Sequence, residues 1–271
     1  MSPVEVAWRT LVALTICLIL AASSLRNRSL STSGAAAAIL VGTVVILSGN
    51  QFALAMMAFF LSSSRITKLG SERKQMIESE FRKGGRRTAI QVFCNSLSAV
   101  VVAALHAYWF GIDFNPNPPR LSLQMQVFVH AFFACCAGDT WASELGVLCR
   151  QQPKLLVTGR VVPPGTNGGV TTGGLLASCC GGIFQGIVWY LATQVSPAVI
   201  LIGAVSGVVG SLLDSLLGST VQFSGLDQST GKVVNHPGEN VKPISGLDIL
   251  SNDHVNLLSA TLTGFLAASC F

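Results

Sequence analysis

Long uncharged runs alternate with short polar segments along the whole chain. A helix needs about 20 apolar residues to cross a bilayer. Runs close to or above that length occupy residues 4–25, 29–64, 88–112, 121–148, 168–195, 198–223 and 254–271. The second run is too long for one span and is interrupted by Ser48-Gly49-Asn50-Gln51, so it is predicted to form a hairpin of two short helices. The pattern therefore predicts an all-α, polytopic integral membrane bundle of about eight transmembrane helices.

Composition agrees with a membrane protein. The chain is 50% hydrophobic and 11% charged, whereas a soluble domain carries about 25% charged residues. No polar stretch is long enough for a second core, so residues 1–271 are predicted to form a single membrane domain with polar loops at 65–87, 150–167 and 224–253. Ala21-Ala22-Ser23 could mark a signal-peptide cleavage site, but Glu5 beside Arg9 is atypical of a signal peptide and favours a retained first span.

The Lys and Arg residues are distributed unevenly between the two sides of the membrane. With eight spans, all 17 of them except Arg9 and Arg120 fall on one side. Because cytosolic loops are enriched in Lys and Arg, the polar loops are predicted to face the cytosol, in an organelle membrane such as the endoplasmic reticulum. These loops account for the net charge of +5, so membrane lipid is an expected partner and nucleic acid is not. The oligomeric state stays open.

Three acidic residues lie in or at the end of predicted spans: Asp139, Glu144 and Asp214. A carboxylate in a membrane segment costs about 2.5–3.5 kcal/mol, which a cation, a metal or water usually offsets. Both spans that carry the aspartates end near the predicted cytosolic face. Asp139 and Asp214 are therefore predicted to hold Mg²⁺, which typically takes one or two protein carboxylates together with phosphate oxygens. Glu144, in the same interfacial turn as Asp139, is a third catalytic candidate. The alternative is that these acids cap helices or pair with loop arginines.

Basic and glycine-rich segments near these acids are candidates for phosphate binding. The candidates are Lys68, Lys74, Arg86, Arg87, Lys154, Gly165, Thr166, Asn167, Gly168 and Gly169. Lys and Arg recognise phosphate oxygens directly, and the N–H groups of a glycine-rich turn before a helix can form an anion-binding nest. The turn is no Walker A loop, because no Lys-Ser/Thr pair follows its glycines. The alternatives are basic loops that contact anionic lipids and an ordinary turn between a loop and a helix.

Polar and small residues recur at helical spacing inside the spans. The polar candidates for lining a substrate site or packing between helices are Asn95, Ser143, Ser211, Asn252 and Asn256. Interhelical hydrogen bonding is as good an explanation for such faces as ligand contact. Gly182 and Gly186, like Gly203 and Gly207, are four residues apart and predict close helix approach. The eight Cys form no CxxC pair, which argues against a zinc site.

Four motifs together carry a family resemblance. They are Gly138-Asp139-Thr140-Trp141-Ala142-Ser143-Glu144, Pro163-Pro164-Gly165-Thr166-Asn167-Gly168-Gly169-Val170-Thr171, Gly210-Ser211-Leu212-Leu213-Asp214-Ser215 and Asn252-Asp253-His254-Val255-Asn256. Over nearly its whole length the chain resembles the transmembrane protein 19 family, also called domain of unknown function 92. Plant chloroplast members of this family are similar to phytyl-phosphate kinase, which converts an isoprenyl monophosphate to its diphosphate.

The resemblance implies a membrane-embedded kinase that phosphorylates a prenyl monophosphate of the phytyl or geranylgeranyl type at the cytosolic face. Its cofactors would be Mg²⁺ and a nucleoside triphosphate, either CTP or ATP. The alternative is a transporter of an anionic or lipid-like solute, for which buried acids and interrupted spans are also typical. A transporter needs a polar path through to the other side of the membrane. A purely structural membrane protein is a third possibility, and it would leave Asp139 and Asp214 without a role.

Overall fold

The structure is a computed structural model that describes residues 3–77, 85–149 and 151–271. Its helices are α1 Pro3–Arg26, α2 Thr32–Ser48, α3 Asn50–Ile66, α4 Ser71–Ile77, α5 Ala89–Cys94, α6 Leu97–Phe110, α7 Arg120–Gly146, α8 Thr172–Thr193, α9 Ala198–Val221 and α10 Asn252–Ser269. Its strands are β1 Lys154–Leu155, β2 Gly169–Val170, β3 Ser224–Asp227, β4 Val233–Val234 and β5 Val241–Ser245. The predicted helical membrane bundle is confirmed, and two small antiparallel sheets in the polar loops were not predicted.

The break predicted in the second apolar run is present. Helices α2 and α3 meet at Gly49, whose φ of +151° is a conformation that residues with a Cβ rarely adopt. A Cβ on Gly49 would also lie 3.0 Å from the side chain of Gln51. The polar segment Ser48-Gly49-Asn50-Gln51 therefore ends α2 and starts α3, as the sequence predicted.

The run from 88 to 112, predicted to be one span, is not one continuous helix. It is divided into α5 and α6 at Asn95 and Ser96. Asn95 Nδ2 donates to Gln91 O at 2.8 Å, and Ser96 Oγ donates to Val92 O at 2.7 Å. Such local side-chain bonds compete with helical backbone bonds. The break lies in a helix that borders the candidate site, a position typical of discontinuous membrane helices.

The count of eight spans is not confirmed. Among the described residues, four helices are long and apolar enough to cross a membrane: α1, α7, α8 and α9. Helices α3 and α4 pass the same test together, but they are bent by 76° relative to one another, so they form either a broken fifth span or a re-entrant loop. Helices α2 and α6 are apolar but shorter. The protein is therefore a multi-pass membrane protein whose spans are partly short or interrupted.

Helix α7 forms the centre of the bundle. It packs against α3, α6, α8, α9 and α10, and every residue from Met125 to Gly138 is buried. Glycines allow this packing: a Cβ on Gly138 would lie 2.7 Å from Gly207 Cα, and one on Gly182 would lie 2.2 Å from Gly203 O. The close helix approach predicted from these glycine spacings is present between α8 and α9, with α7 against both.

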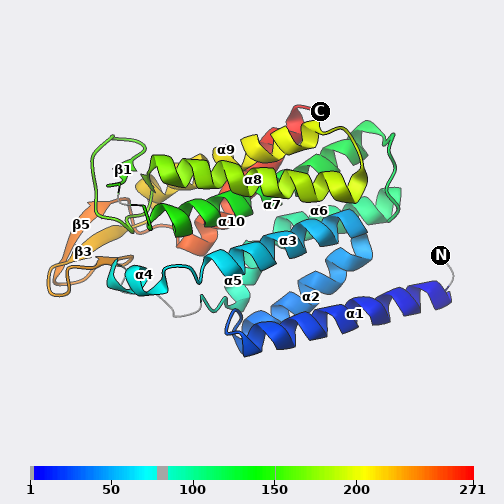
Figure 1. Ribbon diagram of the computed structural model, residues 1–271, viewed down its shortest axis with the longest axis horizontal. Helices are drawn as coiled ribbons and strands as arrows, with labels where there is room; N and C mark the ends of the chain where they lie inside the picture. Colours follow the sequence, from blue (N-terminus) through cyan, green and yellow to red (C-terminus); the bar gives the residue numbers. More distant parts are fainter. Residues whose placement is uncertain (1–2, 78–84, 150) are drawn as a thin grey trace.

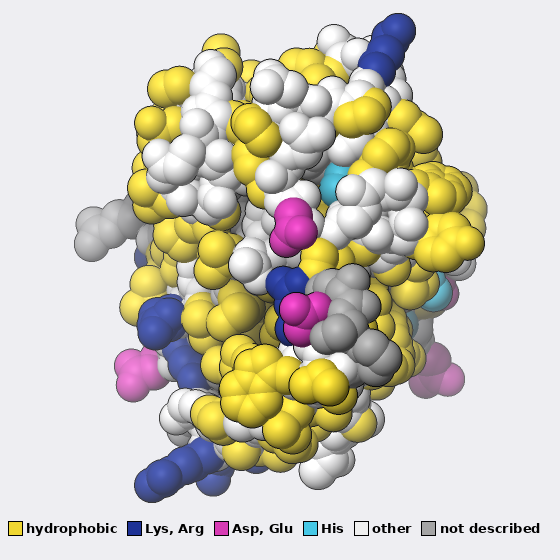
Figure 2. Space-filling view, turned by 90° about the vertical axis from the view of Figure 1, so that its right-hand side faces the viewer, with side chains coloured by type: hydrophobic (Ala, Val, Ile, Leu, Met, Phe, Trp, Pro, Cys, Tyr) yellow, Lys and Arg dark blue, Asp and Glu magenta, His cyan; other side chains and the backbone are white. Residues whose placement is uncertain are grey.

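The polar loops gather at one end of the bundle. Helix α4 and the sheets lie at the left in Figure 1, and the two chain termini lie at the other end. Figure 2 looks at that other end, where hydrophobic and uncharged side chains predominate and charged ones are few. This arrangement agrees with the predicted grouping of the loops, and their assignment to the cytosolic side stays a prediction. The part of the first basic loop at residues 78–84 lies outside the described residues.

Candidate functional site

A polar cavity of about 1170 Å³ opens at the end of the bundle that carries the loops. Its walls come from α5, α7, α8, α9 and α10, together with the glycine-rich turn and the segment before α10. The predicted candidates that line it are Lys74, Arg86, Arg87, Asn95, Asp139, Ser143, Glu144, Gly165, Thr166, Asn167, Gly168, Gly169, Ser211, Asp214, Asn252 and Asn256. Segments far apart in the sequence therefore meet in one pocket.

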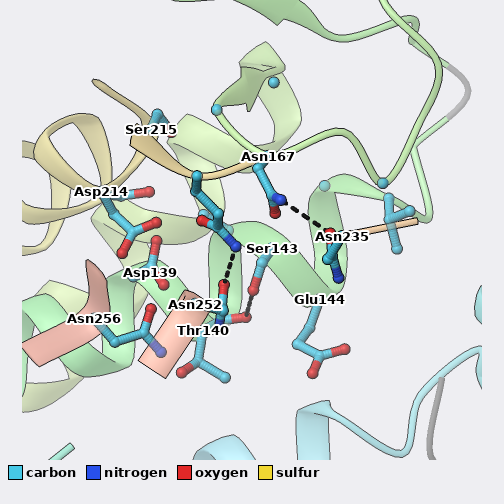
Figure 3. A pocket seen from close by; sticks show the side chains of 18 of the residues that line it. Asp139, Thr140, Ser143, Glu144, Asn167, Asp214, Ser215, Asn235, Asn252 and Asn256 are labelled. Atoms are coloured by element: carbon cyan, nitrogen blue, oxygen red, sulfur yellow. Dashed lines mark hydrogen bonds between the residues drawn. The ribbon is translucent and has the colours of Figure 1, made fainter. Parts of the chain in front are cut away.

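Asp139 and Asp214 form the polar centre of this cavity. Asp139 lies on α7 and Asp214 on α9, and Figure 3 shows their side chains pointing toward one another. The two helices can approach this closely because Gly138 and Gly207 meet without side chains between them. This close contact of α7 and α9 lies directly before Asp139 in the sequence.

The partners of the two aspartates are neutral. Ser211 lies beside Asp139 in the cavity lining, and Ser259 Oγ donates to Asp214 Oδ2 at 3.2 Å. With its amide oriented to satisfy hydrogen bonding, Asn256 donates to the same Asp214 oxygen at 3.1 Å. Neither aspartate forms an ion pair with a Lys or Arg of the described chain. Two carboxyl groups of the described chain therefore face each other without an ion-pair partner, and a bound cation would stabilise both as carboxylates.

Glu144 does not join the aspartates. Figure 3 shows its side chain directed away from them, and it forms an ion pair of 2.5 Å with Lys74 Nζ. Lys74 is only 2% exposed and also donates to Thr67 O at 3.2 Å. The two charges neutralise each other, and both residues line the cavity, so the catalytic role predicted for Glu144 and the phosphate-binding role predicted for Lys74 stay predictions. The pair fixes α4 against the end of α7.

Two arginines supply positive charge to the pocket wall. Arg86 is exposed. Arg87 lies over the rings of Phe59 and Phe60, with ring centroids 5.4 and 5.5 Å from its Cζ. Burial lowers the pKa of Arg87 and the carboxylate of Glu144 raises it, and an arginine in this position remains a cation at neutral pH. The backbone of Arg87 is held by the turn between α1 and α2.

Two predicted phosphate ligands lie outside the cavity wall. Lys68 Nζ donates to Asn27 O at 2.9 Å, and Lys154 is exposed on β1. Neither residue lines the pocket. Each follows a residue that does line it, Thr67 and Pro153, so both loops reach the cavity while the phosphate-binding role of these two lysines stays a prediction.

The glycine-rich turn is a wall of the pocket whose donors are largely in use. Thr166 Oγ1 donates to Pro163 O at 2.7 Å. Asn167 N donates to Ser224 Oγ at 3.0 Å, and its Nδ2 donates to Phe223 O at 3.0 Å and to Asn235 Oδ1 at 2.9 Å (Figure 3). Gly169 N donates to Thr166 O at 3.1 Å. The turn therefore ties β3 and β4 to the pocket, and these three residues have few donors left for an anion.

Glycines let this turn pack directly on α9. Gly168 has a φ of +74°, and a Cβ there would lie 2.5 Å from both Ser215 O and Ser219 N. Gly218 on α9 faces the turn in the same way, since its Cβ would lie 2.9 Å from Gly168 N. Ser215 follows Asp214, so the turn supports the segment of α9 that carries the carboxylate.

Several residues that line the cavity were missed by the sequence analysis. They are Gln91, Thr140, Ser215, Gln222, Asn235, His236, Asp248 and Asp253, among others. Thr140, Ser215 and Asp253 lie inside motifs that were recognised. Asn235, His236 and Asp248, in the loops beside the strands, had no comparable signal, because nothing in the local pattern of residues 224–253 predicts that this segment folds back over the pocket.

The oxygen-rich donor set suits a hard divalent cation. Among the described residues there is no group of three or more His, Cys, Asp or Glu side chains that could hold a metal. Mg²⁺ nevertheless needs only one or two protein carboxylates, because it keeps several waters and binds phosphate oxygens. The carboxylates of Asp139 and Asp214, with neutral hydroxyl and amide neighbours, fit that requirement.

Fold and site together describe a multi-pass membrane protein with an acidic pair in a polar pocket at one end. The sequence model of integral membrane protein DUF92 matches residues 15–264, and the chain belongs to this family. The predicted family is therefore confirmed.

Relatives cover most of the chain. Protein PGR of Arabidopsis thaliana is 39% identical over 96% of each chain. The chloroplastic protein VTE6 of the same plant is 28% identical, over 84% of this chain and 68% of its own length. An uncharacterised membrane protein of Methanocaldococcus jannaschii is 25% identical over 97% of this chain. No solved structure matches. These relatives give no support for the endoplasmic reticulum, since VTE6 is chloroplastic.

Proposed function

We propose that this protein is a membrane-embedded kinase that transfers a phosphoryl group to a prenyl-type monophosphate, giving the diphosphate. The observation that carries the proposal is the pair formed by Asp139 and Asp214. The pair faces a polar cavity of about 1170 Å³ and forms no ion pair with a Lys or Arg of the described chain. The family resemblance to phytyl-phosphate kinase noted from the sequence supports the same chemistry. Phosphoryl transfer depends mainly on positioning and on stabilisation of negative charge, which this pocket could provide.

Asp139 and Asp214 would hold Mg²⁺ between the phosphates of the donor and the acceptor. The ion would neutralise charge that develops on the transferring phosphoryl group. Ser259 would orient the carboxylate of Asp214 through its hydrogen bond, and Ser211 lies beside Asp139. The donor would be a nucleoside triphosphate, CTP or ATP.

Arg86 and Arg87 are the cations best placed to contact phosphate oxygens, because both line the cavity. A guanidinium offers several N–H donors in a fixed plane that matches phosphate geometry. Lys74 contributes less, since its charge is already matched by Glu144. The phosphate-binding role predicted for the cations thus becomes a proposal centred on two arginines.

The prenyl chain would leave the cavity sideways toward the lipid. Ile90 on α5 lines the cavity and is 61% exposed, so the pocket reaches the flank of the bundle at the first turn of that helix. Phe59 and Leu175 add apolar surface to the lining. An amphiphilic substrate could then place its phosphate beside the aspartates and its hydrocarbon chain in the membrane.

The test is phosphoryl transfer by the purified full chain in detergent. The assay would combine Mg²⁺, CTP or ATP, and phytyl or geranylgeranyl monophosphate, and would measure diphosphate product by mass spectrometry. The proposal expects product that depends on the protein, on Mg²⁺ and on one of the two nucleotides. Monodisperse protein that gives no product with either donor and either acceptor would contradict it.

Buried polar groups favour a second candidate, a transporter of an anionic or lipid-like solute. Gln51, His106, His130 and Gln185 lie on α3, α6, α7 and α8, and each is at most 3% exposed. Gln51 Nε2, Nδ1 of both histidines and both amide atoms of Gln185 have no partner within the described structure. Unpaired polar groups in a membrane interior are typical of a hydrated path. Flux of prenyl monophosphate across liposomes, without chemical conversion, would favour this candidate over the kinase.

A further inference from the structure

The side-chain amide of Asn256 faces the aspartate pair from α10. One of its two amide atoms lies 3.1 Å from Asp214 Oδ2 and 3.2 Å from the backbone oxygen of Asn252. Both neighbours are acceptors, so in the cation-free protein this atom must be the nitrogen, which donates to each of them. A half-turn of the amide about its last bond would place the oxygen there instead. Three oxygens would then converge on one point, an arrangement that only a cation could stabilise.

The position of Asn256 is fixed independently of its amide orientation. Helix α10 begins with Ser251 as its N-cap, whose side chain accepts a hydrogen bond from His254 N. Ser259 Oγ lies within hydrogen-bonding distance of both Asn256 O and Asp214 Oδ2, at 3.2 Å in each case. The amide can therefore rotate while the helix and Asp214 keep their places.

A cation held by two carboxylates needs further oxygen ligands. No third His, Cys, Asp or Glu joins the aspartates within the described part of the chain, and Glu144 is paired with Lys74. Side-chain amide oxygens are ordinary ligands of hard divalent cations. The side-chain amide of Asn256 lies within hydrogen-bonding distance of Asp214 itself.

We propose that Asn256 is a third protein ligand of the divalent cation held by Asp139 and Asp214. Its amide donates to Asp214 when the cation is absent and turns its oxygen to the cation when the cation is bound. The inference rests on the metal site of the proposed function, and it does not depend on phosphate chemistry.

The experiment measures Mn²⁺ binding to the purified full chain in detergent, without nucleotide or prenyl phosphate. Free Mn²⁺ is followed by electron paramagnetic resonance for wild type, Asn256→Asp and Asn256→Leu. We expect Asn256→Leu to weaken binding about tenfold or more, as loss of a ligand or its support typically does. We expect Asn256→Asp to tighten binding about tenfold, because the ion gains a charged oxygen ligand. Asn117→Asp adds the same charge to an exposed turn at the other end of the bundle and should leave binding unchanged.

The opposite response to Asn256→Asp would overturn the inference. If Asn256 served only to donate to Asp214, a third carboxylate would repel the pair, and Asn256→Asp would weaken Mn²⁺ binding as much as Asn256→Leu. Absence of Mn²⁺ binding by wild type would overturn it as well.

A second measurement uses only protein that folds as the wild type does. Electron–nuclear double resonance on wild type carrying asparagine labelled with ¹³C at the side-chain carbonyl should show a Mn–¹³C coupling. Absence of that coupling in Mn²⁺-loaded wild type would refute ligation by an amide. These readouts are independent of kinase activity. A protein that binds Mn²⁺ as described but forms no diphosphate would refute the proposed function and leave this inference standing.

Discussion

Replacing Lys74 with methionine should destabilise the protein more than any exposed lysine substitution. The Lys74 side chain is 3% exposed and that of Glu144 is 21% exposed, and their charged atoms are 2.5 Å apart. Lys74→Met keeps the length and apolar part of the side chain but leaves Glu144 without its cation. Removing one partner of a buried ion pair costs about 3–5 kcal/mol. Because Glu144 keeps some contact with solvent, we expect about 2–3 kcal/mol.

The substitution should also release α4 from the bundle. Two other contacts hold this helix: Arg73 donates to the backbone oxygens of Leu148 and Cys149, at 2.9 and 3.2 Å, and Lys232 Nζ donates to Gln75 O at 2.9 Å. These bonds join exposed groups and contribute less than the buried pair. Loss of Lys74 should therefore raise the protease sensitivity of the segment around α4 before the remaining bundle unfolds.

Thermal unfolding in detergent, followed by circular dichroism, measures the effect. A loss of 2–3 kcal/mol corresponds to a fall in Tm of about 5–10 °C for a chain of this size. Lys242→Met removes an exposed lysine and is the matched control, with an expected change close to zero. Lys74→Met combined with Glu144→Gln should be more stable than Lys74→Met alone, because the unpaired charge is gone. Equal melting temperatures for Lys74→Met and Lys242→Met would refute the reasoning.

Three further predictions follow from contacts elsewhere in the structure. Gly182→Ala places a Cβ 2.2 Å from Gly203 O, so it should lower the Tm and the yield of monodisperse protein. Leu176→Ala, on the exposed face of α8, should lower neither. Equal yields of the two variants would contradict the close packing of α8 on α9. Asn167→Ala removes the hydrogen bonds to Phe223 O and Asn235 Oδ1, so it should speed limited proteolysis within residues 151–168. Asn240→Ala is the exposed control. Unchanged cleavage of Asn167→Ala would mean that other contacts hold the turn. Asp227 accepts hydrogen bonds from Ser229 and Thr230, and these bonds lower its pKa. The ionised side chain therefore stabilises the β3–β4 turn fully at pH values above its ordinary pKa of about 4, and hydrogen-exchange protection of the turn should fall as the pH drops through the lower pKa of the folded state. Asp227→Asn should remove this pH dependence.

The long helices were predictable because a helix in a membrane must be apolar over most of its length, and such apolar runs can be recognised in the sequence. Uncharged runs located nearly every long helix, and the polar segment at Gly49 located the hairpin. The break at Asn95 was missed because residues 88–112 read as one apolar run. It depends on side-chain bonds from Asn95 and Ser96 to carbonyls of the preceding turn, and the same residue types are common in unbroken membrane helices.

The candidate site was partly predictable for a similar reason. Acids within apolar segments are rare enough to identify Asp139 and Asp214, and the alternation of spans predicts that both approach the same end. The partner of Glu144 could not be predicted, because Lys74 lies 70 residues away on a helix that bends by 76° from α3. Asn167 is a similar case, since its side chain bonds to residues 56 and 68 positions away. Such pairings follow from tertiary packing and leave no local signal.

The central claim is that Asp139 and Asp214 jointly hold the metal that supports phosphoryl transfer. The most direct measurement compares diphosphate formation by wild type, Asp139→Asn and Asp214→Asn under saturating Mg²⁺, nucleotide and prenyl monophosphate. Each substitution keeps the side-chain shape and removes one charge. The account predicts that both variants melt near or above the wild-type temperature, since repulsion between the carboxylates is relieved, and lose at least about 100-fold in turnover. Wild-type turnover in either variant would contradict the claim.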